Sequence, residues 1–370
     1  RMDNPLEKAQ NGFITFTDVP DGNYRVTITV GSADKAGATV IRGESRRLFY
    51  ETIVTKKGEF KEVTFIINKR NTQINESDWV RIKPREKAKL NWDNNLTVEI
   101  SGANPQAKSV VVTAVSNVTT IFLCGNSTVV DQDNEPWASW GQMIPRFFNN
   151  QVSFANYAES GESANTFIAA GRFKKILTQM KAGDYIFIEF GHNDQKQIGP
   201  GKGPYLHYYN SLKEMIDQSR EKGGIPVLVT PTQRRSFNEK GKILDTHGDY
   251  PAAMKKLATD AQVPLIDLHA MTRTLYEALG VEESKKAFVH YPANSFPGQT
   301  KALEDNTHFN PYGAYQIAKC VIEGMKDIDL PLLQNLRPDV SKYSPAKPDK
   351  ISKFEWFPSA FYEVEKPDGN

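Results

Sequence analysis

The sequence is poor in the features that mark several classes of protein. It holds only two cysteines, Cys124 and Cys320, so a framework of several disulfides cannot organise the fold. Both lie in apolar patterns, which favours two buried thiols and leaves one disulfide between them as the alternative. No run of about 18 apolar residues occurs, so we expect no bilayer-spanning segment. The formal net charge is only +2, which favours neither nucleic acid nor a membrane surface as a partner.

Motifs that mark metal sites and ordinary α/β-hydrolases are also missing. The sequence has no His-Glu-x-x-His pair for zinc and no Gly-x-Ser-x-Gly nucleophile turn, which disfavours a metalloenzyme and an ordinary α/β-hydrolase. Asp131-Gln132-Asp133-Asn134-Glu135 starts like a calcium loop, but it lacks the glycine at the sixth position and the closing glutamate. We therefore interpret it as a solvated loop, and we expect neither a metal nor a cofactor.

The length of 370 residues predicts two domains, and the strand patterns place the first in residues 1–116. No convincing helix interrupts this region, which predicts an antiparallel β-sandwich. Its expected strands are Tyr24–Val30, a hairpin of Phe49–Val54 and Val63–Ile67, then Leu96–Ile100 and Val110–Val115. In the loop that follows Leu90, Trp92 fits either a packed core residue or a platform that stacks on a sugar.

From Thr119 onward, strand patterns alternate with helix patterns, which predicts a parallel sheet covered by helices over residues 117–335. The expected strands are Ile121–Cys124, Val152–Ala155, Tyr185–Phe190, Val227–Thr230 and Leu265–Leu268. The expected helices are Asn165–Met180, Leu206–Glu221, Asp249–Gln262 and one that starts at Asn310-Pro311. Residues 336–370 are rich in proline and aromatic residues, which predicts an extended strap packed across the α/β region and back toward the first domain.

Four polar blocks lie at strand–loop junctions of the α/β region, and a parallel sheet would bring them to one edge. They are Gly125-Asn126-Ser127, Ser160-Gly161-Glu162-Ser163, Gly191-His192-Asn193-Asp194, and Asp305-Asn306-Thr307-His308 on a short loop before the last helix.

Together these blocks supply the parts of a serine hydrolase. His308 is placed to take the proton of the Ser127 hydroxyl, and Asp305 to hold the other ring nitrogen of that histidine. The backbone N–H groups of Ser127 and Gly161 and the side-chain amide of Asn193 are candidate donors to an oxyanion. Each block alone would fit an ordinary turn or helix start, so the prediction depends on all four occurring in this order.

The four blocks resemble those of the SGNH (GDSL-type) hydrolases. Gly-Asn-Ser-Thr-Val, Ser-Gly-Glu-Ser-Ala, Gly-His-Asn-Asp and Asp-Asn-Thr-His-Phe-Asn are most similar to rhamnogalacturonan acetylesterases of carbohydrate esterase family 12. The resemblance covers about residues 119–330. It implies a flavodoxin-like three-layer α/β/α fold and removal of acetyl esters from pectic rhamnogalacturonan. It also implies Ser127 as nucleophile, Asp305 and His308 as its triad partners, and Gly161 and Asn193 in the oxyanion hole.

Two features qualify this resemblance. The family's first block usually reads Gly-Asp-Ser, whereas this chain has Asn126, and we expect activity because Asp305 is the acid that orients the base. Arg234 and Arg235 follow the strand Val227–Thr230, at the same sheet edge. They fit either a binding site for the carboxylates of galacturonate or a surface pair with acidic partners.

The alternatives are a deacetylase of xylan or another glycan, and a carbohydrate-binding protein with a lapsed hydrolase domain. The second follows from the resemblance of the first domain to galactose-binding-like modules. Acetylated pectin as substrate implies an extracellular or periplasmic protein, although the first residues, Arg1-Met2-Asp3, begin no apolar leader segment. The sequence does not predict the oligomeric state.

Overall fold

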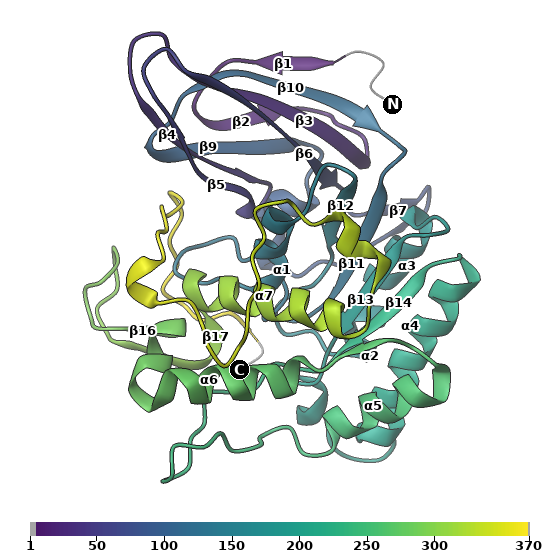
Figure 1. Ribbon diagram of the computed structural model, residues 1–370. Coiled ribbons are helices and arrows are strands. Elements are labelled where there is room, and N and C mark those ends of the chain that lie inside the picture. Colours follow the sequence, from purple (N-terminus) through teal and green to yellow (C-terminus); the bar gives the residue numbers. More distant parts are fainter. Residues whose placement is uncertain (1–4, 369–370) are drawn as a thin grey trace.

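The computed structural model describes residues 5–368, which form an N-terminal part made of strands and a larger α/β part (Figure 1). Two four-stranded antiparallel sheets make up the first part, in the orders β1-β10-β3-β6 and β2-β9-β4-β5. Both contribute to one hydrophobic core, which includes Ile28, Ile41 and Val98. The strands are β1 (Leu6–Lys8), β2 (Gly12–Phe16), β3 (Gly22–Gly31), β4 (Gly37–Gly43), β5 (Arg47–Thr55), β6 (Phe60–Lys69), β9 (Leu96–Asn104) and β10 (Ala107–Val115), with a small ribbon of β7 (Gln73–Asn75) and β8 (Asp78–Trp79).

The predicted hairpin between Phe49–Val54 and Val63–Ile67 is wrong. These segments lie in β5 and β6, which follow one another in sequence but belong to different sheets. Strand β5 pairs with β4, whereas β6 pairs with β3 over its whole length. The turn Lys56–Glu59 therefore carries the chain from one sheet to the other. The residues of the turn do not determine whether the two flanking strands pair with each other.

The predicted parallel sheet is confirmed. It has five strands in the order β12-β11-β13-β14-β15, which is the 2-1-3-4-5 order of flavodoxin-like folds. All neighbours run parallel. The bounds are β11 (Thr119–Gly125), β12 (Val152–Asn156), β13 (Tyr185–Glu189), β14 (Ile225–Val229) and β15 (Leu265–Ile266).

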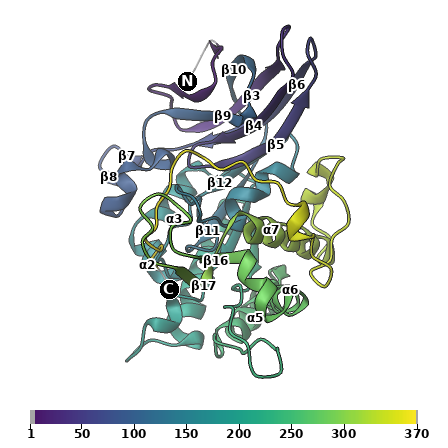
Figure 2. The same ribbon diagram turned by 90° about the vertical axis from the view of Figure 1, so that its left-hand side faces the viewer.

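Helices cover both faces of this sheet because its central strands are apolar on both sides. Ile121 and Leu123 of β11 pack with α1, α6 and α7, whereas Phe122 and Cys124 pack with α2 to α5. The result is three layers (Figure 2). The helices are α1 (Trp140–Met143), α2 (Ala164–Ala169), α3 (Arg172–Gln179), α4 (Tyr209–Glu221), α5 (Tyr250–Ala261), α6 (Leu268–Glu283) and α7 (Pro311–Asp327). None of those in the described residues is long and apolar enough to cross a membrane.

Two helix boundaries differ from expectation for local reasons. Gly171, at φ +84°, breaks the predicted Asn165–Met180 helix into α2 and α3. Helix α6 was not predicted, because its first residue, Leu268, was assigned to the preceding strand. Helix α7 starts as expected, with the Asn310 side chain accepting the N–H of Gly313 and a proline at the first position. Both cysteines are buried and free.

The loop predicted for Asp305–His308 is also wrong. These residues belong to β17 (Leu303–Phe309), which pairs antiparallel with β16 (Phe288–Tyr291) beside the main sheet. The N–H of Ala138 donates to the carbonyl of Phe309 at 2.9 Å, which ties the end of β17 to the segment after β11.

The C-terminal segment, 336–368, runs along the α/β part and back to the N-terminal strands, as the yellow trace in Figure 1 shows. Arg337 donates to the carbonyl of Phe49, and Ser359 Oγ donates to Glu99 Oε1 at 2.6 Å. The Phe361 ring lies 5.1 Å from that of Phe13.

The loop Asp131–Glu135 is not solvated, contrary to expectation. Asp131 and Glu135 are buried because two arginines of the N-terminal part reach them. Arg47 Nε lies 2.9 Å from Asp131 Oδ2, and Arg46 Nη2 lies 2.8 Å from Glu135 Oε1. Asn156 Nδ2 donates to the other Asp131 oxygen at 2.9 Å. Buried ion pairs therefore join the N-terminal strands to the loop that follows β11.

We predict that Asp131→Ala destabilises the protein by about 3–5 kcal/mol, because it leaves the buried Arg47 guanidinium without its anion. Chemical denaturation measures this loss. The matched control is Asp217→Ala, which breaks the exposed Lys213–Asp217 pair of α4 and should cost about 0.5 kcal/mol or less. Equal losses in the two variants would contradict a structural role for the Arg47–Asp131 pair.

Candidate active site

The structure brings Ser127, His308 and Asp305 together at the carboxyl edge of the parallel sheet. Ser127 follows the end of β11, and the other two lie near the end of β17. His308 Nε2 is 2.8 Å from Ser127 Oγ, and His308 Nδ1 is 2.8 Å from Asp305 Oδ2. All three residues are buried, with Ser127 2% and His308 1% exposed. These distances allow a proton to pass from serine to histidine.

The surroundings of Asp305 keep it ionised. Burial alone would raise the pKa of this carboxyl, but the hydrogen bond and charge of His308 and backbone N–H donors lower it below its usual value. The N–H groups of Thr307 and His308 each donate to Asp305 Oδ1 at 2.8 Å. The ionised Asp305 accepts the Nδ1–H of His308, which leaves Nε2 as the acceptor that faces Ser127.

The three predicted oxyanion donors lie in the segments that follow three adjacent parallel strands, β12, β11 and β13. Gly161 has φ +84°, a left-handed conformation that favours glycine. In the described part of the chain, the backbone N–H groups of Ser127 and Gly161 have no protein acceptor. Asn193 Nδ2 donates to the carbonyl of Glu162 at 2.9 Å, which fixes the amide and leaves its second N–H for a ligand.

Asn126 belongs to a buried network that the sequence did not reveal. Thr128 Oγ1 lies 2.8 Å from Asn126 Oδ1 and 2.8 Å from Glu189 Oε2, and Asn126 Oδ1 also accepts the N–H of Thr128. One hydroxyl hydrogen cannot serve two acceptors, so the Glu189 carboxyl must supply a proton. Burial raises the pKa of Glu189 to about 7, which agrees with a protonated group. Asparagine thus keeps the acceptor that the turn needs and avoids a second carboxylate beside Glu189.

Trp92, for which the sequence left a sugar platform open, and two tryptophans near the site are packing residues. Trp92, Trp137 and Trp140 are all 6% exposed or less. The Trp137 ring meets the His308 ring edge-on at 5.9 Å. Trp140 Nε1 donates to Glu189 at 3.4 Å. Trp137 therefore supports the His308 ring, and Trp140 supports the Glu189 side chain.

Arg234 lies at the predicted sheet edge, but its guanidinium binds neutral protein groups. Nη1 donates to Gln195 Oε1 at 2.9 Å and to Thr246 Oγ1 at 3.0 Å, and Nη2 donates to the carbonyl of His192 at 3.4 Å. These contacts hold the loop that carries Asn193. They give Arg234 a supporting role in this loop.

Arg235 is occupied in the same way. Its Nε donates to Ser284 Oγ at 2.9 Å, its Nη1 to Asn306 Oδ1 at 3.0 Å, and its Nη2 to the carbonyl of Val281. Among the described residues no ion pair within 4.0 Å is formed by either arginine, although Glu282 interacts with Arg235 electrostatically. The geometry does not favour the substrate-binding prediction for either residue.

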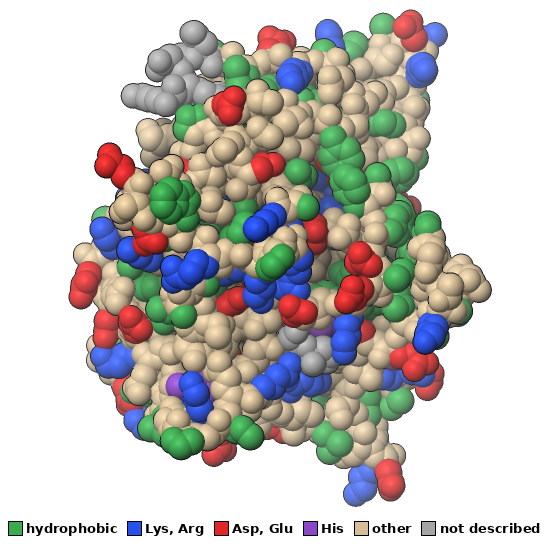
Figure 3. All heavy atoms as spheres, turned by 180° about the vertical axis from the view of Figure 1, so that it is seen from behind, with side chains coloured by type: hydrophobic (Ala, Val, Ile, Leu, Met, Phe, Trp, Pro, Cys, Tyr) green, Lys and Arg blue, Asp and Glu red, His purple; other side chains and the backbone are tan. Residues whose placement is uncertain are grey.

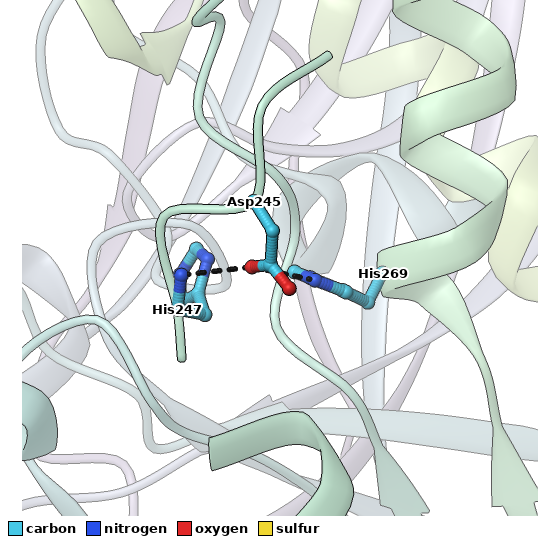
Figure 4. Close-up of side chains that lie close together, drawn as sticks. All are labelled: Asp245, His247 and His269. Atoms are coloured by element: carbon cyan, nitrogen blue, oxygen red, sulfur yellow. Dashed lines mark hydrogen bonds and ion pairs between the residues drawn. The ribbon is translucent and has the colours of Figure 1, made fainter. Parts of the chain in front are cut away.

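Three side chains near this edge come close enough to hold a metal ion. Ligand atoms of Asp245, His247 and His269 lie within 4.8 Å of one another (Figure 4). The His269 Nδ1–H donates to the carbonyl of Pro231 at 2.8 Å, and His269 Nε2 is already 2.9 Å from Gln233 Nε2. Burial, together with the charge of Arg234, lowers the pKa of His247 to about 2, and the positive charge of Arg234 also disfavours a cation there. The cluster is therefore a poor cation site.

Comparison with known proteins decides the family. Residues 123–314 match the model of the GDSL-like lipase/acylhydrolase family. The chain belongs to this family. The matched region starts within β11 and extends into α7, so it includes Ser127, Gly161, Asn193, Asp305 and His308.

Relatives with assigned names match more than half of the chain. The rhamnogalacturonan acetylesterase RhgT of Bacillus subtilis is 46% identical over 218 residues, which cover 58% of this chain and 93% of that protein. The rhamnogalacturonan acetylesterase of Emericella nidulans is 28% identical, over 59% of this chain and 91% of that protein. A crystal structure of YxiM from Bacillus subtilis shares the fold over 85% of this chain and 80% of that one, with 23% identity and a TM-score of 0.52.

We predict that Glu189→Gln removes a pH dependence of stability. The pKa of Glu189 rises from an ordinary 4.5 to about 7 on folding, so its favourable contribution is complete below pH 4.5 and is lost as pH rises through 7. Relative to the variant, the wild-type protein should lose roughly 3 kcal/mol between pH 4.5 and 8.

The measurement is the free energy of unfolding of both proteins across this pH range. Asp194, whose pKa burial also raises to about 7, is common to both proteins and cancels in the difference. Parallel stability curves would show that Glu189 is ionised in the folded protein, against the network described above.

Proposed function

We propose that this protein is a serine esterase that removes acetyl groups from pectic rhamnogalacturonan. The observation that carries the proposal is the Ser127–His308–Asp305 relay, with both of its hydrogen bonds at 2.8 Å. Membership of the GDSL-like family and the names of the relatives support the choice of ester and polymer.

The geometry supports a two-step acyl transfer. His308 Nε2 accepts the proton of Ser127 Oγ as this oxygen attacks the acetyl carbonyl. The Ser127 and Gly161 N–H groups and the Asn193 amide stabilise the negative oxygen that forms. His308 then gives the proton to the departing sugar oxygen, which leaves an acetyl-serine. Water, deprotonated by His308, attacks this ester, and acetate leaves as Ser127 regains its proton.

The burial of the site supports a small acyl group. Ser127, His308 and Trp137 are each 2% exposed or less, so only a small part of the nucleophile and its base is open to a substrate. An acetyl group on a sugar hydroxyl is among the smallest esters that such a site can accept.

We also propose roles for the remaining parts of the chain. The two facing sheets of the N-terminal part fit a β-sandwich of the galactose-binding-like kind, which would help retain the polymer. Because pectin lies outside cells, the substrate supports an extracellular or periplasmic location.

Ser127→Ala tests the proposal. The variant should release acetate from acetylated rhamnogalacturonan at least about 1000-fold more slowly, because no other group can form the acyl intermediate. Its retention by the polymer in affinity electrophoresis should be unchanged. Acetylated xylan is the comparison substrate, and faster release from xylan by the wild-type protein would favour that polymer. Turnover that survives in Ser127→Ala, or a wild-type protein that binds but never releases acetate, would refute a serine esterase.

A further inference from the structure

A cavity of about 640 Å³ lies beside the active site, and two of its three walls come from outside the family region. One wall is the segment Lys83–Lys89 between β8 and β9, one is the loop Gln132–Trp137, and one is the C-terminal stretch Glu363–Asp368. In Figure 3, Lys and Arg side chains gather across the middle of the molecule, with acidic side chains among them.

The cavity adjoins the reacting atoms. Trp137, one of its lining residues, contacts the His308 ring, and Ser160, another, directly precedes Gly161. Gln132 Nε2 donates to the carbonyl of Ser127 at 3.0 Å. A sugar ring in the cavity would therefore lie next to the sugar whose acetyl group reaches Ser127.

Arg85 is the best-placed cation of this cavity. Its Nη2 donates to the carbonyl of Ser160 at 2.8 Å and to Glu159 at 3.2 Å, so buried acceptors fix one edge of the guanidinium. Lys83 lies alongside, with Nζ bonded to the same carbonyl. The side chains of Arg85 and Lys83 are 34% and 30% exposed, so both can also reach a ligand in the cavity.

A carboxylate of the chain itself occupies the other edge of Arg85. Asp368 Oδ2 lies 2.7 Å from Arg85 Nη1, and the Asp368 side chain is 64% exposed. The same Asp368 covers Gly161: a Cβ added to that glycine would lie 3.0 Å from Asp368 Cβ and 3.7 Å from Oδ2. A carboxylate bound to Arg85 thus lies no farther from Gly161, in the predicted oxyanion hole, than the width of one sugar ring. Lys366, on the same stretch, also lines the cavity and adds positive charge.

We propose that Arg85, assisted by Lys83, binds the carboxylate of a uronic acid residue of the polymer, and that Asp368 occupies this subsite in the free enzyme. The inference rests on the proposed function for the identity of the polymer. A planar guanidinium with one edge fixed presents its other edge to a carboxylate in a defined orientation, which favours a uronate over a neutral sugar. Because an exposed ion pair is weak, the substrate can displace Asp368.

Two variants should change the kinetics in opposite directions. Arg85→Gln should raise KM for acetylated rhamnogalacturonan by about tenfold with little change in kcat, because it removes a charge-assisted hydrogen bond. Asp368→Asn should lower this KM by about threefold, because it weakens the competing carboxylate. Arg85→Lys, which keeps the charge, should fall between wild type and Arg85→Gln.

Controls separate recognition of the uronate from damage to the site. The loss in Arg85→Gln should be at least about fivefold greater on the polymer than on nitrophenyl acetate, which lacks a uronate. Arg220→Gln is the matched control, since this exposed arginine of α4 binds only the carbonyls of Ala261 and Gln262. An unchanged KM in Arg85→Gln, or equal losses on polymer and nitrophenyl acetate, would overturn the subsite.

Failure of the proposed function would be recognised separately. If the wild-type protein hydrolyses nitrophenyl acetate but not the acetylated polymer, the assigned reaction is wrong. The subsite is then decided by calorimetry with galacturonate oligosaccharides. Weaker binding to Arg85→Gln than to wild type would support it, and equal binding would overturn it.

Discussion

The hydrogen bond between Ser127 Oγ and His308 Nε2 is the interaction on which the rest of the site depends. It joins residues 181 positions apart, so it forms only if the ends of β11 and β17 are fixed relative to one another. The parallel sheet fixes β11, and the bond from Ala138 to Phe309 ties β17 to the chain that leaves the serine. The hydrogen bond between Thr128 and Glu189 then holds the turn around Asn126 in place. The fold thus supplies the orientation that a serine hydroxyl needs to become a nucleophile.

The N-terminal strands take part in this arrangement rather than forming a detached module. Arg46 and Arg47 are buried and bind the loop Asp131–Glu135, which follows the nucleophile and leads to Trp137. Farther along, Glu86 binds Arg172 of α3 through two hydrogen bonds of 2.8 and 2.7 Å. Because charges buried in pairs are costly to separate, these contacts explain how sequence outside the family region can shape the cavity beside the active site.

The catalytic parts and the parallel sheet could be predicted from sequence because each depends on local signals. Ser127 and Asn193 follow apolar strands, and Asn310-Pro311 marks the start of α7. Features that depend on distant partners could not be predicted in this way. The strands β5 and β6 are neighbours in sequence, but β5 pairs with β4 and β6 pairs with β3. Likewise, the positions of Arg234 and Arg235 at a sheet edge do not reveal which acceptors their guanidinium groups bind. The sequence indicated the Asn126 network only by the position of Glu189, a charged residue at the end of the buried strand β13.

The most direct test of the central claim is covalent labelling with a fluorophosphonate, which reacts with activated serines. The account predicts one label per chain, located on Ser127 by mass spectrometry, and much slower labelling of His308→Ala, in which no base takes the serine proton. A label on another serine, or equal labelling with and without His308, would contradict the Ser127–His308–Asp305 relay.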